Sequence, residues 1–354
     1  METPSLRDIA NEAGVHISTV SRALRGQHSI PVETRRRIRN LADSLGYRPN
    51  PLTSALMEAR RSGSSPKFRA MLGILVFGKR DHAWRNNIWL YEVYQGAICY
   101  AKSMGYEVDV FWMGDEKISA KRFNNILLTR NLQGLILPPE HEGTLPLEID
   151  WNEFAVVSLH LGKPNGLPWF HQVVSNHYQS MSKACKECYE LGYNRVGLVL
   201  RDHPNRHYQF GRAVFGAFSA QVVEQSAEDR IEPLVLDELS KDRVEDWVMA
   251  EKPECVLMAG GGFSLDNRLE DYAELFKRCS LRLGYDIGYV LMCQQDGVNE
   301  AGIDQRMGVI GESAARLLID MITRNERGIP DDPMLQLVNC SWREGSSLPM
   351  ISSD

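Results

Sequence analysis

The chain has 354 residues, of which 43 % are hydrophobic and 24 % charged, and its net charge is −6. This length allows more than one domain with a sizeable core. No apolar run reaches the roughly 18 residues of a membrane span, and the N-terminal segment METPSLRD has neither the basic nor the apolar region of a secretory signal. We therefore exclude a transmembrane chain and expect a cytoplasmic protein.

The charge is unevenly distributed along the chain. Residues 1–62 hold ten Arg, no Lys and six acidic residues, a net charge of +4, which leaves −10 for the remainder. A basic head on an acidic body localises a phosphate-binding surface to the first domain.

The N-terminal region begins with the pattern of two short helices joined by a tight turn. The first helix is predicted over residues 6–13, with Ser5 as its N-cap and Asp8 three residues later in a capping box. Gly14 supplies the turn, because a sharp backbone reversal favours a residue without a Cβ. Val15 fills the corner that follows.

The second helix is predicted over residues 17–24, with one apolar face and one polar face. The apolar face turns inward and consists of Val20, Ala23 and Leu24. The opposite face is small and hydroxyl-rich with one guanidinium, which suits base edges and phosphates in a major groove. Its residues are Ile17, Ser18, Ser21 and Arg22. An ordinary α-hairpin on the surface of an enzyme is the alternative at this point.

A third helix is predicted within residues 28–47. Its apolar residues repeat at the spacing i, i+3, i+4 and i+7, and they are Ile38, Leu41, Ala42 and Leu45. Pro31 suits the first helical position and Gly46 the position after the helix end. Four arginines near its start are placed to reach phosphates, namely Arg35, Arg36, Arg37 and Arg39.

A short helix is predicted after the third one, in the segment YRPNPLTSALMEARR. Asn50 is its expected N-cap, Pro51 its first residue, and Ala59 lies near its end. An isolated helix this short is marginal in water. We therefore expect it to order only against a partner helix and DNA.

The motifs AGV-x-x-STVSR, TR-x-x-I and LGYRPN, followed by Leu56, closely resemble the LacI/GalR family of bacterial transcription regulators. The resemblance is strongest over residues 5–57 and continues in pattern over the rest of the chain. It implies a helix-turn-helix DNA reader fused to a sugar-binding-protein-like sensor. It also implies that the helix from Ile17 reads the major groove and that paired hinge helices enter the minor groove, where Leu56 wedges between base steps.

On this resemblance, contacts with double-stranded DNA are expected from the helix-turn-helix, the third helix and the hinge. The expected residues are Leu6, His16, Ile17, Ser18, Thr19, Ser21, Arg22, Arg25, Ser29, Thr34, Arg35, Asn50, Thr53, Leu56 and Met57. Paired hinge helices and a two-fold operator require each other. We therefore expect a homodimer on a pseudo-palindromic operator.

From Met71 onward, short buried strands alternate with amphipathic helices. MLGILVF is a continuous apolar run, as expected for a central parallel strand, and the alternation predicts open parallel sheets in two lobes. The predicted domains are a helix-turn-helix domain (1–48), a hinge helix and linker (49–67) and a two-lobed, periplasmic-binding-protein-like α/β sensor (68–354). The first lobe is expected at 68–172 and 297–329, and the second at 173–296 and 330–354.

The seven cysteines are scattered, which predicts reduced and mostly buried thiols in a chain without an export signal. Cys185 and Cys188 form a C-x-x-C, but they lie within a helical pattern and have no second pair. A zinc site needs four ligands. We therefore expect two small apolar residues on a helix face, and neither metal nor cofactor.

Ligands of parallel sheets bind at the carboxyl ends of the strands, here between the two lobes. Sugars favour aromatic faces and planar polar groups, and such residues follow the predicted strands. The candidate effector contacts are Trp84, Asn87, His171, Asn176, Arg206, Arg212 and Asp296. The spacing of Arg206 and Arg212 also resembles two family positions that contact effector, allowing a one-residue shift in register.

Several positions depart from the family pattern. Gly260, Gly261 and Gly262 follow Ala259 where the family commonly has Ala-Asn-Asp, and Cys293 stands where Asp is common, with Asp296 as the substitute. The loss of carboxylate and amide ligands indicates an unusual effector or weak binding. It also leaves open a regulator that has lost effector control.

The sequence predicts a non-enzymatic, sequence-specific DNA-binding regulator that represses carbohydrate-related genes under the control of a sugar or sugar derivative. The alternative is a solute-binding protein of a sugar uptake system, which would need an export signal and would leave residues 1–59 unexplained. No nucleophile–base arrangement, pair of carboxylates or metal motif in the sequence predicts catalysis.

Overall fold

The computed structural model describes residues 6–24, 30–47, 70–77, 88–113, 119–130, 132–137, 149–162, 167–201, 210–223, 225–236, 240–259, 276–294, 297 and 299–351. The chain forms two compact units, Met1–Phe68 with Thr323–Asn325, and Arg69–Ile322 with Glu326–Asp354. The boundary expected between residues 48 and 49, and the hinge helix after it, lie outside the described residues.

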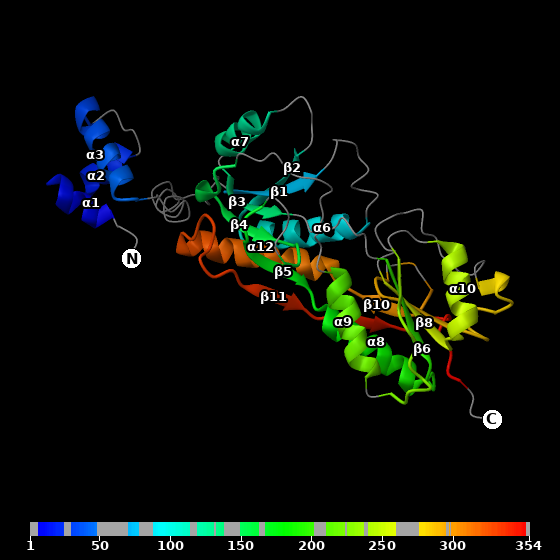
Figure 1. Ribbon diagram of the computed structural model, residues 1–354. Coiled ribbons are helices and arrows are strands. Elements are labelled where there is room, and N and C mark those ends of the chain that lie inside the picture. The colour runs from blue at the N-terminus through cyan, green and yellow to red at the C-terminus, as the bar shows by residue number, and fades with distance from the viewer. Residues whose placement is uncertain are drawn as a thin grey trace. The chain divides into compact units, whose positions relative to one another are not determined.

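The small unit contains three described helices, α1 (Leu6–Ala13), α2 (Ile17–Leu24) and α3 (Val32–Ser44) (Figure 1). The bounds of α1 and α2 are those predicted. α3 begins one residue later than predicted, because Pro31 lies before the helix and its carbonyl accepts the backbone N–H of Arg35. Pro31 therefore occupies the N-cap rather than the first helical position.

The first lobe of the large unit is built on a six-stranded sheet in the order β11-β5-β4-β3-β1-β2. Its strands are β1 (Met71–Phe77), β2 (Glu107–Met113), β3 (Leu132–Leu137), β4 (Ala155–Ser158), β5 (His171–Ser175) and β11 (Leu335–Val338). All the pairings in this sheet are parallel. β3, β4 and β5 are buried along their whole length, as expected of parallel strands covered on both faces.

Helices cover both faces of this sheet. α6 (Ile88–Ser103) and α12 (Met307–Arg324) lie side by side on one face, and α7 (Ala120–Thr129) lies on the other (Figure 1). Ser119 caps α7 by accepting the backbone N–H of Arg122. A short 3-10 helix, Trp151–Glu153, leads into β4.

The second lobe is built on another six-stranded sheet, in the order β12-β10-β9-β8-β6-β7. Its strands are β6 (Val196–Arg201), β7 (Leu234–Leu236), β8 (Cys255–Ala259), β9 (Gly288–Leu291), β10 (Gly302–Asp304) and β12 (Ser341–Arg343). β12 pairs antiparallel with β10 at one edge, and the other pairings are parallel. The described helices are α8 (His177–Glu190), α9 (Phe210–Val222) and α10 (Lys241–Glu251). The predicted two-lobed α/β fold is confirmed.

Strand pairing places the three crossings between lobes later in the chain than the sequence indicated. β5 ends the first segment of lobe one at Ser175, beyond the expected boundary at 172. β10 belongs to the second sheet, so the second lobe continues to Asp304, beyond its expected boundary at 296. β11 belongs to the first sheet, so the first lobe continues to Val338, beyond its expected boundary at 329. The physical reason is that β10 and β11 have only 3 and 4 residues, too few for periodicity to show where they pair.

Candidate functional site

The turn between α1 and α2 is closed by backbone hydrogen bonds around a left-handed glycine. Gly14 has φ of +63°, its N–H donates to the carbonyl of Asn11, and the N–H of Val15 donates to the carbonyl of Ala10. This pair of bonds is the Schellman motif, which satisfies carbonyls at a helix end. No other atom would meet a Cβ at position 14 within 4 Å, so the backbone conformation alone accounts for the glycine.

A small apolar core holds the three helices in place. Its buried members come from all three helices and the segment before α3, and they are Ile9, Ala10, Val20, Ala23, Ile30, Ile38 and Ala42. Val15 packs against this core at the turn, as predicted. Val20 and Ala23 thus fix the rotation of α2 about its axis, and the opposite face of α2 is left to the solvent.

The outward face of α2 is the one expected from the sequence. Ile17, with 40 % of its surface exposed, lies there with exposed Ser18 and Arg22. Thr19 and Ser21 are half-buried beside them. Arg22 follows Ser18 by four residues, so the two side chains lie on the same side of the helix. We call Ile17–Leu24 the recognition helix from here on.

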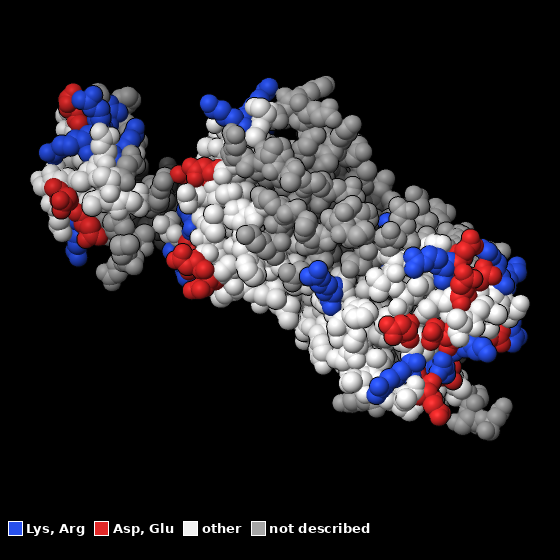
Figure 2. Space-filling view, viewed as in Figure 1, with Lys and Arg blue, Asp and Glu red and all other residues white. Residues whose placement is uncertain are grey.

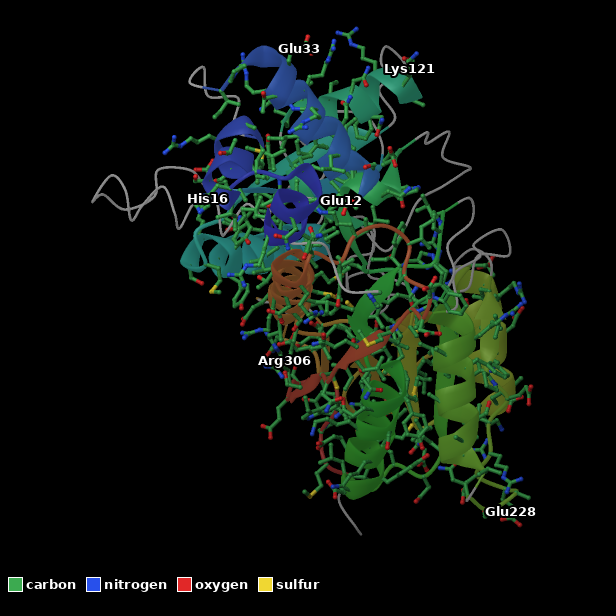
Figure 3. The ribbon with its side chains drawn as sticks, turned by 90° about the vertical axis from the view of Figure 1, so that its left-hand side faces the viewer. Glu12, His16, Glu33, Lys121, Glu228 and Arg306 are labelled. Atoms are coloured by element: carbon green, nitrogen blue, oxygen red, sulfur yellow. The ribbon has the colours of Figure 1, made fainter. Side chains whose placement is uncertain are left out.

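His16 caps the recognition helix with its imidazole ring. Nδ1 of His16 accepts the backbone N–H of Ser18 over 3.3 Å and lies 2.8 Å from the Ser18 hydroxyl oxygen. The carbonyl of His16 accepts the N–H groups of Thr19 and Val20. The ring therefore serves as the N-cap of this helix; His16 is labelled in Figure 3.

The arginines of α3 have two different environments. Arg37 donates to the carbonyl of Ala13 at the end of α1, over 3.2 Å, so it ties the two helices together. Arg36 is exposed and pairs with Glu33 one turn away, over 3.5 Å. Arg39 is exposed and Arg35 half-buried. Figure 2 shows several basic side chains, all of them Arg, on this unit, and such a surface suits a polyanion.

Two of the remaining residues expected to contact DNA, Leu6 and Thr34, lie within the described part of the small unit. Leu6 packs against the helical core and is half-buried, as is Thr34 on α3. Those outside the described residues are Arg25, Ser29, Asn50, Thr53, Leu56 and Met57.

The three crossings of the large unit are joined by side-chain hydrogen bonds. Asn176, the N-cap of α8, donates its amide to the side-chain oxygen of Asn339 over 2.9 Å. The Cys340 backbone N–H donates to the side chain of Gln179 over 3.1 Å. Ser180 donates to Gln305 over 3.4 Å. We call these residues the crossing cluster. Through these hydrogen bonds, each of the three chain segments that pass between the lobes contacts at least one of the other two.

Asp304 stabilises a strained backbone at the crossing between β10 and α12. Arg306 has φ of 55°, unusual for a residue with a Cβ, and lies at the start of α12 (Figure 3). Its backbone N–H donates to the Asp304 carboxylate over 2.7 Å. The same carboxylate accepts the guanidinium of Arg343 on β12 over 2.6 Å. One side chain thus holds both the end of β10 and the neighbouring strand.

Residues of the two lobes approach each other at the carboxyl end of β9. Cys293 follows this strand, and burial, the nearby Glu92 of α6 and Asp304 raise the pKa of its thiol to about 12. Cys293 is therefore uncharged at neutral pH and offers no carboxylate-like negative charge. Glu92 belongs to a first-lobe helix, whereas Cys293 and Asp304 belong to the second lobe.

The expected effector contacts are not all at the carboxyl ends of strands. Asn176 directly follows β5 and Arg212 is exposed near the start of α9. His171 lies at the opposite, amino end of β5, buried, where its Nδ1 accepts the backbone N–H of Met334 over 3.0 Å. Trp84, Asn87, Arg206 and Asp296 lie outside the described residues.

Three polar residues that lie at the end of a strand or beside the residues after one were not among the predicted site residues. His160 is buried two residues beyond β4, and its backbone N–H donates a hydrogen bond to the Ser158 hydroxyl oxygen. Asp304 ends β10, and Glu92 approaches Cys293 from α6. His160 and Asp304 carried a usable signal, because each comes shortly after an apolar run. Glu92 carried none, because only the tertiary structure brings it to Cys293.

The C-x-x-C lies in the second-lobe core, as expected of a helix face. Cys185 and Cys188 of α8 are buried, and the Cys188 sulfur lies 3.6 Å from that of Cys255 on β8. Burial raises the pKa of the Cys185 and Cys255 thiols. Among the described residues, no His, Cys, Asp and Glu side chains gather in a group that could hold a metal ion. None of the described helices combines the length and apolarity of a bilayer crossing.

Comparison with known proteins shows the same architecture in DNA-binding regulators. Residues 5–50 match the family described as bacterial regulatory proteins, lacI family. The regulator RafR of Escherichia coli is 25 % identical over 213 residues, which cover 59 % of this chain and 58 % of RafR. The matched part is thus less than two thirds of that relative's length.

Two solved structures align with almost the whole chain. The transcriptional regulator CelR in complex with cellobiose has a TM-score of 0.57 at 17 % identity, covering 97 % of this chain and 99 % of that one. The Lac repressor dimer bound to operator and the anti-inducer ONPF has a TM-score of 0.54 at 16 % identity, covering 98 % and 100 %. Residues 5–50 thus match the lacI family, and the two solved structures show that the whole chain shares the fold of these regulators.

Proposed function

We propose that this protein is a sequence-specific, double-stranded-DNA-binding regulator that represses carbohydrate-related genes, and that it acts as a regulator rather than as an enzyme. The observation that carries the proposal is the recognition helix, whose inner face is locked by Val20 and Ala23 while Ile17, Ser18 and Arg22 stay exposed. Residues 1–62 carry a net charge of +4 in a chain of net charge −6. The activity would take place in the cytoplasm.

In this proposal, the residues of the small unit divide into base contacts and phosphate contacts. Ile17, Ser18 and Arg22 read base edges, since a helix placed in the major groove presents its exposed face to them. Arg36 and Arg39 on α3 contribute mainly charge, which strengthens binding to any DNA. The hinge residues from Asn50 to Met57 complete the interface in the minor groove.

A sugar or sugar derivative bound between the lobes is the proposed effector. Asn176 and Arg212 supply planar polar groups near the carboxyl ends of strands, and hydroxyl groups pair well with such side chains. His171 is left out of this proposal, because it is buried at the amino end of β5. The uncharged Cys293 in place of a carboxylate favours an effector with fewer hydrogen-bond donors at that point.

The crossing cluster offers a route from effector to DNA. Asn176 is both a proposed effector contact and a partner of Asn339 at another crossing. An effector that prefers one arrangement of the lobes shifts their equilibrium by its differential affinity. A coupling of about 1–3 kcal/mol is enough for a useful switch.

A homodimer fits the partly exposed apolar surface of the first lobe. β2 is an edge strand, and the side chains of Val108, Val110 and Trp112 along it are half-buried. On α6, Tyr91 is 41 % exposed and Ile98 is half-buried. A two-fold homodimer would supply two recognition helices, one for each half of a pseudo-palindromic operator.

The first test is binding of the full-length chain to genomic fragments and to random duplex DNA at several salt concentrations. We expect selective binding that weakens steeply with salt, and a change in affinity with one member of a sugar panel. Arg22→Ala should weaken operator binding by about tenfold or more while leaving random DNA nearly unaffected. Arg36→Ala is the matched control, and it should weaken both equally and reduce the salt dependence. Equal loss of operator and random binding in Arg22→Ala would refute base reading by this residue.

A second test addresses the predicted hinge. Leu56→Ala should leave the thermal unfolding of the large unit unchanged but lower operator affinity, because the wedge between base steps is lost. Binding measured by fluorescence anisotropy on the same operator checks this. Parent-like affinity of the variant would show that the hinge helix is placed at the wrong residues.

A further inference from the structure

The cap of the recognition helix has a chemical consequence for Ser18. Nδ1 of His16 is bonded to the backbone N–H of Ser18 over 3.3 Å, and a backbone N–H can only donate. Nδ1 must therefore be the unprotonated, accepting nitrogen. In the neutral ring the hydrogen then lies on Nε2.

The Ser18 hydroxyl is constrained by the same nitrogen. Its oxygen lies 2.8 Å from Nδ1, and because Nδ1 has no hydrogen to give, the hydroxyl must donate. A serine hydroxyl has one hydrogen and two acceptor lone pairs. With its hydrogen directed at His16, Ser18 can offer only lone pairs to another molecule. An isolated serine could instead donate or accept, and would discriminate poorly between bases.

We propose that His16 sets the hydrogen-bonding polarity of the recognition helix, so that Ser18 Oγ selects an exocyclic amino group in the major groove. The groups of this kind there are N6 of adenine and N4 of cytosine. Guanine O6 and thymine O4 are acceptors and would face lone pairs. The inference rests on the proposed function and adds which class of base Ser18 selects and why.

The position of Ser18 supports a direct role in base recognition. It is exposed on the face opposite the buried Val20 and Ala23. It is also four residues before Arg22 and next to the exposed, apolar Ile17. His16 is itself exposed beside it, so its Nε2–H is free to approach the DNA as a donor while Nδ1 holds the hydroxyl.

The test is selection of binding sites from a randomised duplex library by the full-length chain and by four variants. Ser18→Ala removes the hydroxyl, and His16→Ala removes the group that orients it. His16→Asn keeps an accepting oxygen near the place of Nδ1, since Asn is a favoured N-cap. Ser44→Ala is the matched control, because this exposed serine also bonds locally, to the carbonyl of Leu41, but lies on α3.

We expect the parent, His16→Asn and Ser44→Ala to prefer adenine or cytosine at one base of each half-site. Ser18→Ala and His16→Ala should lose that preference by about fivefold or more, with the other positions retained. Where the preferred base is adenine, its replacement by purine, which lacks the amino group, should lower the parent's affinity for its best site by a similar factor. The affinity of Ser18→Ala should not change on this replacement.

The outcomes separate the two proposals. If the parent enriches no sequence, the proposed function fails. If the parent enriches a site but His16→Ala keeps its full preference at every base, or loses affinity evenly at all bases, His16 acts only as a helix cap and the inference is overturned. Hydrogen exchange of the small unit identifies a variant that has merely unfolded. If His16→Ala has unfolded, the base preferences of His16→Asn and Ser18→Ala are compared instead.

Discussion

At the scale of single residues, backbone conformation explains two positions that side-chain contacts do not. Gly14 has φ of +63° in open space, and Arg306 has φ of 55° at a lobe crossing. A residue with a Cβ is disfavoured in this region by about 1–2 kcal/mol. At Arg306 the Asp304 carboxylate offsets this cost by accepting the backbone N–H, whereas the turn at Gly14 relies on glycine itself.

Replacing Gly14 by alanine should therefore destabilise the small unit although the added methyl group meets no atom. We expect the slowest amides of α1, α2 and α3 to exchange about five to thirty times faster. Hydrogen exchange followed by mass spectrometry measures this. Gly216→Ala, in α9, also has open space but no positive φ, so it should be neutral or stabilising for the large unit. Unchanged exchange in Gly14→Ala would contradict the argument from backbone strain.

At the scale of elements, α6 and α12 approach so closely that glycine is required at their contact. A Cβ on Gly96 would lie 1.9 Å from the carbonyl oxygen of Gly308, and one on Gly311 equally close to that of Val93. The obstacle is backbone in both cases, so no side chain can move aside. This contact joins the helix before β2 to the helix that follows the second crossing.

Gly96→Ala should force the two helices apart. We expect a loss of about 1–3 kcal/mol in the free energy of unfolding of the large unit, the usual cost of overpacking, or more. All seven Trp lie after residue 83, so urea unfolding followed by tryptophan fluorescence reports on this unit. Gly216→Ala serves again as the control, and a Gly96→Ala protein as stable as the parent would show that the helices separate at no cost.

At the scale of the whole molecule, buried titratable groups limit the pH range of stability. Burial lowers the pKa of His177, the first residue of α8, from 6.5 to about 4. Burial raises the pKa of Tyr106 from 10.0 to about 12, and that of Cys293 from 9.0 to about 12 with added repulsion from Glu92 and Asp304. All three groups are neutral when folded at pH 7.

The sign of the pH dependence follows from which state binds more protons. Below pH 6.5 the unfolded chain protonates His177 while the folded chain does not, so stability is lost as the pH falls toward about 4. Above pH 9.0 the unfolded chain loses the Cys293 proton first, so stability falls as the pH rises toward about 12. Urea midpoints between pH 4 and 10 should show a plateau with two declining limbs. His177→Asn should flatten the acid limb only, and a variant with the parent's acid limb would contradict this assignment.

Much of the fold could be predicted from local patterns. The bounds of α1, α2 and β1 agree with the prediction, and Gly14 and Gly46 have the positive φ that a helix end favours. These features depend on residues within a few positions of each other. The apolar face of α2 was also predictable, because its period places Val20 and Ala23 together whatever the rest of the chain does.

The lobe to which a short strand belongs could not be predicted. β10 and β11 have no period of their own, and each joins a sheet through partners far away in the chain, such as β5 for β11. The bond between Ser180 and Gln305, and the approach of Glu92 to Cys293, also join distant segments. The sequence alone determined the helix-turn-helix and the alternation of strands and helices, because those depend on local spacing. Only the tertiary structure decided the crossings, the strained Arg306 and the groups around Cys293, because hydrogen bonding and desolvation there come from residues that folding brings together.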